Sequence, residues 1–153
     1  MKNKISIELV KHRLEQAKED LEAAEILFDN KKFKSANNRA YYSIFHSIRA
    51  VLALEPIDFK KHKTVISYFN KNYINTEIFS KKLGHKIAEA SKLREDSDYD
   101  DYIEDIEDIE DTTLQIETAE QVYNECVNYI ETKVYKLNLQ KEKDKKNDWN
   151  EEV

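Results

Sequence analysis

The stretch FKSANNRAYYSIFHSIRAVLAL, residues 33–54, determines the fold that we expect for this chain. Its apolar residues recur three or four positions apart, which is the spacing of one face of an α-helix. These positions are Phe33, Ala36, Ala40, Ile44, Ile48, Val51 and Leu52. Pro56 follows, and because a proline disfavours helical backbone at the residue before it, we expect the helix to end near Leu54. The stretch therefore predicts a long helix with one buried face.

Four other segments show the same helical periodicity. They cover about Ile7–Phe28, Thr64–Tyr73, Ile78–Leu93 and Ile106–Leu137, and a short polar turn at residues 29–32 separates the first from the central helix. The first, second and last segments are the longest, which is typical of the body of a helical bundle. We therefore predict an all-α fold, an antiparallel up-and-down bundle of about five helices.

The end of the chain differs from the rest in its pattern. Residues 138–153 read NLQKEKDKKNDWNEEV, which is polar and without helical periodicity. A segment of this kind cannot bury enough apolar surface to order itself. The sequence therefore predicts one domain over residues 1–137, as suits a chain of 153 residues, followed by a disordered tail over residues 138–153.

Composition excludes several classes of protein. The chain contains one Gly, one Pro and one Cys. A single glycine excludes Gly-rich phosphate loops, and it disfavours the many tight turns of sandwiches and barrels. A single cysteine excludes a disulfide framework and a thiolate zinc site, and the histidines lack metal-binding spacing, so we expect no metal or other cofactor. Without a membrane-length apolar run or a signal-peptide core, we expect a cytoplasmic protein with no membrane association.

Charge is distributed unevenly around the net value of −6. Residues 1–94 carry +8, residues 95–111 carry −11 and residues 112–153 carry −3. The acidic run Glu95–Asp111 lacks the glycine and the spacing of a calcium-binding loop. We interpret it as a solvated loop that leads into a helix N-terminus, where carboxylates are favourable, and docking to a basic partner is the alternative.

A polar stripe runs along the central helix. Arg39 and His46 are seven residues apart, so both project from one face, and Tyr42 lies between them. The stripe consists of Ser35, Asn38, Arg39, Tyr42, His46 and Arg49. A solvated face, or an Arg and a His that bind neighbouring carbonyl groups, would account for it. The alternative is a functional surface, because a polar stripe within a bundle needs partners.

The stripe has the groups for one particular reaction. Histidine changes its charge near neutral pH, so it can exchange a proton with a ribose 2′-hydroxyl that attacks the neighbouring phosphodiester. An adjacent arginine can bind the phosphate and stabilise the charge that develops there. This chemistry needs no metal ion. One histidine cannot comfortably act as both base and acid, so we expect two copies, contributed by a homodimer.

Residues outside the stripe are further candidates for a role at the same site. Lys61 and His62 lie in a basic cluster before the third helix, and they could contact phosphates or belong to a solvated loop. Cys126 lies near the apolar face of the last helix, where a small core residue is expected. Most tyrosines and phenylalanines have core spacing, and Tyr42 is the exception that could stack on a base.

Three stretches of the chain resemble the HEPN family (higher eukaryotes and prokaryotes nucleotide-binding), in particular its small stand-alone prokaryotic branch. They are RAYYSIFHSIRAVLA (residues 39–53), which has the family's Arg-x(4–6)-His spacing, KHKTVISYFNK (61–71) and LREDSDYDD (93–101). The resemblance implies an all-α bundle, often a homodimer, in which both protomers form a metal-independent endoribonuclease site. It also implies a toxin whose antitoxin is a minimal nucleotidyltransferase.

Carried over to this sequence, the resemblance makes Arg39 the phosphate-binding residue and His46 the residue that transfers protons. Asn38, Tyr42, Arg49, Lys61 and His62 are then candidates for RNA or nucleotide binding. Two positions depart from the pattern: Ala40 follows Arg39 where active members often have a polar residue, and Ile48 stands where some toxins have a tyrosine that the antitoxin adenylylates. A non-catalytic nucleotide- or partner-binding module and a purely structural dimerising bundle are the alternatives.

Overall fold

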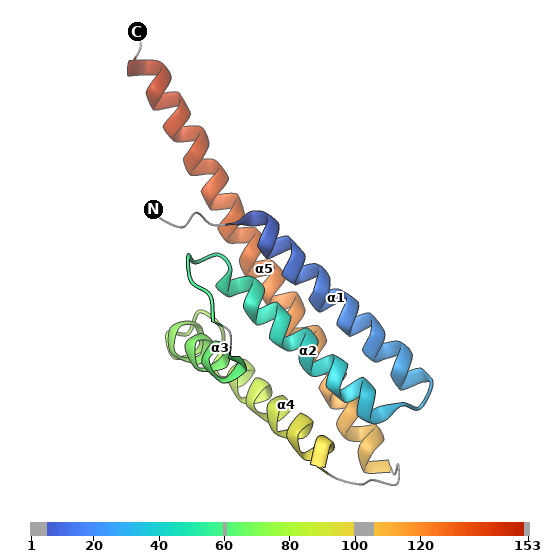
Figure 1. The fold of residues 1–153 in the computed structure, drawn as a ribbon. Helices are drawn as coiled ribbons and strands as arrows, with labels where there is room; N and C mark the ends of the chain where they lie inside the picture. The colour runs from blue at the N-terminus through green and yellow to red at the C-terminus, as the bar shows by residue number, and fades with distance from the viewer. Residues whose placement is uncertain (1–5, 60, 100–105, 152–153) are drawn as a thin grey trace.

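The computed structural model describes residues 6–59, 61–99 and 106–151. Over these residues the chain forms helices and no strand, as predicted, and the helices pack as an antiparallel bundle (Figure 1). The elements are α1 (Ile7–Asp29), α2 (Phe33–Leu52), α3 (His62–Phe69), the π-helical turn η1 (Asn70–Ile74), α4 (Lys81–Tyr99) and α5 (Ile106–Glu151). The all-α bundle predicted from the sequence is therefore confirmed.

Helices α1 and α2 form a closely packed hairpin. Ser6 caps α1 by accepting a hydrogen bond from the backbone N–H of Leu9 at 3.1 Å. The turn after α1 uses left-handed backbone at Lys31, with φ of 61°. Four alanines line the buried side of the two helices, at positions 17, 24, 36 and 40. Their small size brings the backbones close enough for the Ser43 hydroxyl to donate to the Ala17 carbonyl at 2.7 Å.

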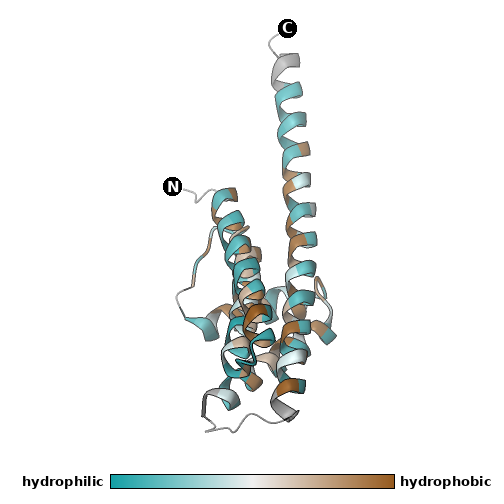
Figure 2. Cartoon of the chain, turned by 90° about the vertical axis from the view of Figure 1, so that its right-hand side faces the viewer, coloured by the Kyte–Doolittle hydropathy of each residue, from teal (hydrophilic) through white to brown (hydrophobic). Residues whose placement is uncertain are grey.

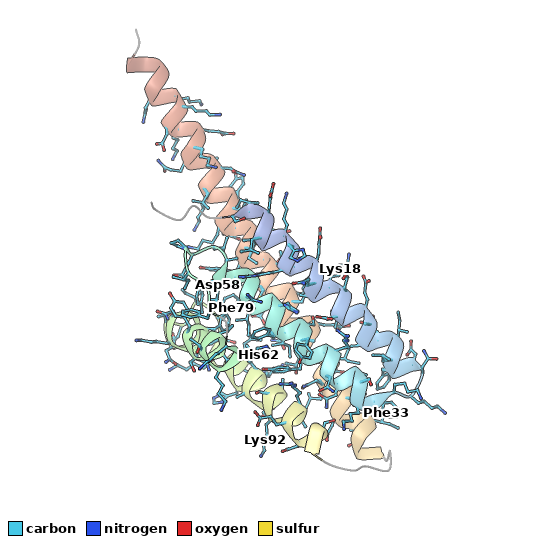
Figure 3. The ribbon with its side chains drawn as sticks, in the orientation of Figure 1. Lys18, Phe33, Asp58, His62, Phe79 and Lys92 are labelled. Atoms are coloured by element: carbon cyan, nitrogen blue, oxygen red, sulfur yellow. The ribbon has the colours of Figure 1, made fainter. Side chains whose placement is uncertain are left out.

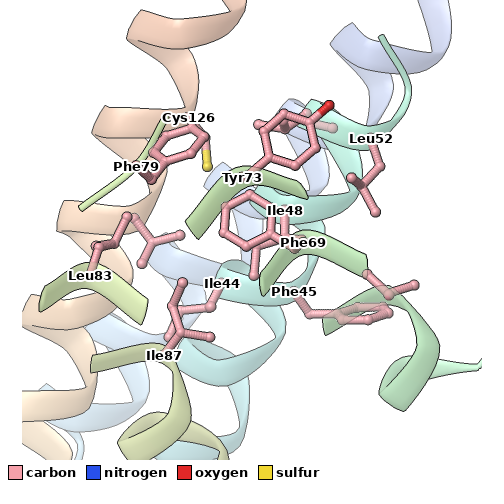
Figure 4. Close-up of a cluster of buried hydrophobic side chains, with 14 of the residues drawn as sticks. Ile44, Phe45, Ile48, Leu52, Phe69, Tyr73, Phe79, Leu83, Ile87 and Cys126 are labelled. Atoms are coloured by element: carbon pink, nitrogen blue, oxygen red, sulfur yellow. The ribbon is translucent and has the colours of Figure 1, made fainter. Parts of the chain in front are cut away.

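Helix α2 lies at the centre of the bundle and contacts α1, α3, α4 and α5. Its side chains Ile44, Phe45 and Ile48 meet those of the following helices in one hydrophobic core (Figure 4). That core also contains Phe69, Tyr73, Phe79, Leu83, Ile87 and Cys126. Cys126 is fully buried, and burial raises the pKa of its thiol, which confirms that it is a core residue.

The predicted third helix is divided into two kinds of helix. It begins at His62 and changes into the π-helical turn η1 at Asn70. Ser80 caps α4 through the backbone N–H of Leu83, at 3.1 Å. Gly84 follows in α4, and a Cβ atom there would lie 2.7 Å from Cγ2 of Ile74. A glycine inside this helix is therefore explained by the close approach of α4 to η1.

Helix α5 is longer than the periodicity predicted. It continues from Ile106 to Glu151, so residues 138–151 are helical where we expected a disordered tail. No glycine or proline occurs beyond Gly84 to interrupt it, and Gln140 donates to Asp144 one turn later at 3.0 Å. The extension projects past the other helices, and its surface is mainly hydrophilic (Figures 1 and 2). The domain boundary at residue 137 stays a prediction.

The acidic run Glu95–Asp111 is only partly described. Glu95 and Asp96 lie exposed in α4, and Glu110 and Asp111 lie exposed near the start of α5. The loop predicted for this run is therefore wrong at both ends, because α4 continues to Tyr99 and α5 begins at Ile106. Residues 100–105 lie outside the described residues. Across the described ranges, no helix combines the length and the apolar composition that crossing a membrane requires.

Candidate functional site

Five of the six residues of the polar stripe, all except Arg49, face an open groove between α1, α2 and α4. The groove has a volume of about 800 Å³. Its lining residues are Gln16, Glu19 and Asp20 from α1, Ser35, Asn38, Arg39, Tyr42 and His46 from α2, and Arg94 from α4. Four of the predicted site residues, Asn38, Arg39, Tyr42 and His46, are therefore brought together. The stripe forms one wall of a groove that is open to ligands.

Arg39 meets a carboxylate from the neighbouring helix. Its Nη1 atom donates to Oδ1 of Asp20 at 3.0 Å. The side chain of Arg39 remains 54% exposed, whereas that of Asp20 is only 14% exposed. A guanidinium group has five N–H donors, so this contact fixes one edge of the group and leaves the rest available in the groove.

His46 lies beside the same carboxylate. Its Nε2 atom is 3.6 Å from Oδ2 of Asp20, which is too long for a direct hydrogen bond but close enough for electrostatic attraction. The Nδ1 atom is buried and has no hydrogen-bond partner among the described residues. Because the ring as a whole lines the groove, Nε2 is the nitrogen through which it can exchange a proton with a ligand.

Burial lowers the pKa of His46 below its ordinary value of 6.5, so the ring is mainly neutral at pH 7. The charge of Asp20 acts in the opposite direction and favours the protonated ring. Arg49, Arg13 and His62 add smaller effects that lower the pKa further. A neutral imidazole is the form that accepts a proton, as a general base must.

Arg49 is placed differently from the rest of the stripe. Its Nη2 atom lies 3.3 Å from Oδ1 of Asp58, and Arg13 approaches the same oxygen at 3.4 Å. Desolvation acts to raise the pKa of Asp58, but the attraction of Arg13 and the hydrogen bond from Arg49 lower it overall. Arg13 also donates to the backbone carbonyl of Arg49 at 3.0 Å. Arg49 thus belongs to an ion-pair cluster outside the residues that line the groove.

His62 and Tyr42 belong to an aromatic cluster beside the groove. The His62 ring stacks on Phe45 with centroids 3.9 Å apart, and it meets Tyr42 edge-on at 6.1 Å. Arg94 lies over the Tyr42 ring at 5.3 Å from its centroid. Figure 3 labels His62 at the start of α3, next to α2. Burial and the nearby charges of Arg94 and Arg49 lower the pKa of His62. Lys61 is exposed just before α3 and is not among the groove residues.

The structure adds two residues that the sequence analysis did not select, Asp20 and Arg94. The position of Asp20 could be expected from the antiparallel register of the α1–α2 hairpin. Ser43 faces Ala17 and Arg49 faces Arg13 across the turn, and the same antiparallel register places Asp20 opposite the Arg39–His46 stretch. Arg94 lies 52 residues from Tyr42 along the chain, so nothing local in the sequence predicts that they meet.

The two positions that depart from the family pattern lie away from the groove. Ala40 and Ile48 are both fully buried in the core. A side chain at either position therefore faces neighbouring helices, and Asn38 is the polar neighbour of Arg39 that lines the groove. Among the described residues, no group of three or more metal-binding side chains is found.

Comparison with known proteins places the chain in a family. Residues 10–131 match the HEPN domain. Two proteins of Methanocaldococcus jannaschii, named "Putative toxin MJ0605" and "Putative toxin MJ0142", are 39% and 37% identical to the chain over 97 and 87 residues. These alignments cover 63% and 57% of this chain, and 72% and 59% of the two relatives. A "UPF0332 protein" of Thermotoga maritima is 31% identical over 91 residues, 60% of this chain and 69% of the relative. The chain belongs to the HEPN family.

Proposed function

We propose that this HEPN chain is the toxin of a toxin–antitoxin pair and that it cleaves RNA in the cytoplasm without a metal ion. The observation that carries the proposal is the placement of Arg39 and His46 in one open groove of about 800 Å³. Similarity to two proteins named as toxins supports the toxin part of the proposal. The reaction class follows from the two side chains and their surroundings.

In the proposed reaction, the phosphate of the scissile bond binds the exposed edge of Arg39. His46 of one protomer, neutral at pH 7, accepts the proton of the ribose 2′-hydroxyl as the oxygen attacks the phosphorus. His46 of the second protomer donates a proton to the departing 5′-oxygen, and the product carries a 2′,3′-cyclic phosphate. The charge that builds on the phosphoryl oxygens is stabilised by Arg39. All proton transfers are assigned to side chains, so no metal ion takes part.

The composite site requires a homodimer that brings two grooves together. Tyr42, His62 and Asn38 are proposed to contact the RNA beside the scissile phosphate, with His62 and Tyr42 offering ring faces and edges for a base. Lys61 and Arg49 would act on more distant phosphates. A minimal nucleotidyltransferase is the proposed antitoxin, and the buried Ile48 argues that it does not act by modifying that position.

The test is cleavage of a mixed RNA pool by the purified protein in excess EDTA. Wild type, His46→Ala and Arg39→Ala are compared, with Lys18→Ala as a control because Lys18 is exposed on α1 and is not among the groove residues. We expect cleavage by wild type and Lys18→Ala, products with 2′,3′-cyclic phosphate ends, and losses of at least about 100-fold in the other two variants. Equal cleavage by wild type and His46→Ala would refute the proposed site.

A second candidate function is a non-catalytic module that binds a nucleotide or a protein partner. The observation that favours it is the ion pair between Arg39 and Asp20. The Asp20 carboxylate occupies one edge of the guanidinium group and opposes the binding of an RNA phosphate there. Under this alternative, a nucleotide binds in the groove without RNA cleavage. Isothermal titration with ATP and with a purified minimal nucleotidyltransferase, beside the RNA cleavage assay, would separate the two functions.

A further inference from the structure

We propose that Asp20 is a positioning residue, which holds Arg39 and His46 in register and keeps His46 able to carry a proton. This inference rests on the proposed ribonuclease function and adds a residue from α1 to a site built on α2. Asp20 lies between the two side chains, with one oxygen on each: Oδ1 at 3.0 Å from Arg39 and Oδ2 at 3.6 Å from His46.

The Asp20 side chain is largely buried between Arg39 and His46, as expected for a residue that positions its neighbours. Its side chain is 14% exposed, and those of His46 and Arg39 are 20% and 54% exposed. A carboxylate that is mostly removed from water interacts strongly with nearby cations. Its bond to Nη1 restricts the otherwise flexible Arg39, so that the guanidinium edge left in the groove is presented in one orientation.

The charges around His46 show why it needs a carboxylate. From α1, Arg13 repels a proton on the ring, and Arg49 from α2 and His62 from α3 do the same. Arg94 from α4 lines the other side of the groove. Asp20 opposes these cations and the burial of the ring. A composite site needs one neutral and one protonated His46 near neutral pH, and Asp20 is placed to make the protonated form accessible.

The test compares wild type with Asp20→Asn, Asp20→Ser and Asp20→Glu. Glu22→Gln is the matched control, because it removes the same charge two residues away on the same helix. The Glu22 side chain points about 200° around the helix axis from Asp20, away from the groove. The titration of His46 is followed by NMR between pH 5 and 8 in each variant, and RNA cleavage in EDTA is measured over the same range. Thermal unfolding verifies that each variant is folded.

We expect the pKa of His46 to fall in the folded Asn and Ser variants. Because the neutral base and the protonated acid are the same residue in two protomers, both limbs of the pH–rate profile should move to lower pH. Cleavage at pH 7 should drop at least about tenfold, as for loss of a charge-assisted hydrogen bond. Asp20→Glu should restore the profile at least partly, and Glu22→Gln should match wild type.

Two results would overturn the role of Asp20. One is an unchanged His46 titration in folded Asp20→Asn, and the other is faster cleavage, which would mean that Asp20 blocks the groove. Absence of cleavage by wild type would count against the proposed function instead. The NMR titration would still decide whether Asp20 supports the protonated form of His46, so the two failures are distinguishable.

Discussion

His46 couples the stability of the fold to pH through its burial. Its pKa in the folded chain is lowered from 6.5, chiefly by desolvation, so the folded state resists taking up a proton that the unfolded state accepts. The contribution of neutral His46 to stability is therefore present above pH 6.5 and is lost as the pH falls through its lowered folded value. The same sign applies to His62, whose pKa is also lowered by burial.

We predict that His46→Gln makes the free energy of unfolding less dependent on pH between 7.5 and 5. Wild type should lose more stability than the variant over this range, because only wild type must protonate the buried ring. Urea unfolding at several pH values measures the difference. His12→Gln is the control, since His12 is exposed on α1. Parallel curves for wild type and His46→Gln would contradict the prediction.

Individual residues also show which part of the candidate site could be predicted from the sequence. Helical spacing alone placed Arg39, Tyr42 and His46 on one face, and the structure puts all three in the groove. Spacing within α2 could not reveal that Arg49 turns to Asp58 instead. It also could not reveal Asp20 or Arg94: Asp20 follows only from the register of the α1–α2 hairpin, and Arg94 is brought to the site by packing of a helix 52 residues away from Tyr42.

At the scale of the elements, Gly84 marks a close approach between α4 and η1. A Cβ atom there would approach Ile74 Cγ2 to 2.7 Å, and the branched side chain of Ile74 has little freedom to move away. Overpacking costs about 1–3 kcal/mol, whereas alanine gains roughly 1 kcal/mol over glycine inside a helix. We predict that Gly84→Ala lowers the free energy of unfolding by about 1 kcal/mol in urea titrations.

The contact with Ile74 provides an internal check on this prediction. In an Ile74→Ala background the obstructing methyl group is absent, so Gly84→Ala should become neutral or stabilising. Lys82→Ala, at an exposed position on the same helix, should change stability little. If Gly84→Ala destabilises both backgrounds equally, the close approach is not the reason for the glycine.

Gln115 joins three helices through one buried amide. Its Nε2 atom donates to Oδ1 of Asn37 on α2 at 3.0 Å and to the carbonyl of Ala90 on α4 at 2.7 Å. Replacing it by leucine would leave two buried acceptors without this donor. We predict that Gln115→Leu lowers the free energy of unfolding by about 1–3 kcal/mol, measured by chemical denaturation.

A double variant separates the hydrogen bond from simple packing. Asn37→Leu in the Gln115→Leu background removes one of the stranded acceptors, so the two changes together should cost less than their separate costs combined. If the losses in unfolding free energy of Gln115→Leu and Asn37→Leu simply add in the double variant, the Gln115 amide contributes through its packing and not through this hydrogen bond. The sequence could not predict this link, because glutamine is usually exposed and only the packed bundle encloses it.

The same elements show which helix boundaries can be read from sequence. The start of α1, the start of α2 and the start of α5 follow from the apolar pattern and coincide with the structure. The π-helical turn after Phe69 could not be expected, because its residues keep a helical apolar pattern and differ only in hydrogen bonding. The end of α5 was placed too early, because the periodicity that marks a buried face stops before the helix does.

At the scale of the whole molecule, the bundle and the α5 extension differ in how they are stabilised. Among the side chains of α5 that the structure describes, Ile130 is the last that is buried, and Val134 packs partly against the core. Beyond it the described side chains are exposed, including Tyr135 at 64%. An isolated helix of this length is marginal in water, so the extension contributes little to global stability.

The prediction of a domain over residues 1–137 can therefore be tested directly. We predict that deleting residues 138–153 leaves the free energy of unfolding within about 0.5 kcal/mol of wild type, because it removes only exposed side chains among those that the structure describes. Truncation after Asn128 is the contrasting variant, since it removes Tyr129 and Ile130 from the core and should cost several kcal/mol. Urea unfolding measures both. In hydrogen exchange, amides after residue 137 should exchange far faster than those near Cys126. A large loss of stability in the first truncation, or equal protection along α5, would mean that the extension is part of the cooperative unit and that the domain does not end at residue 137.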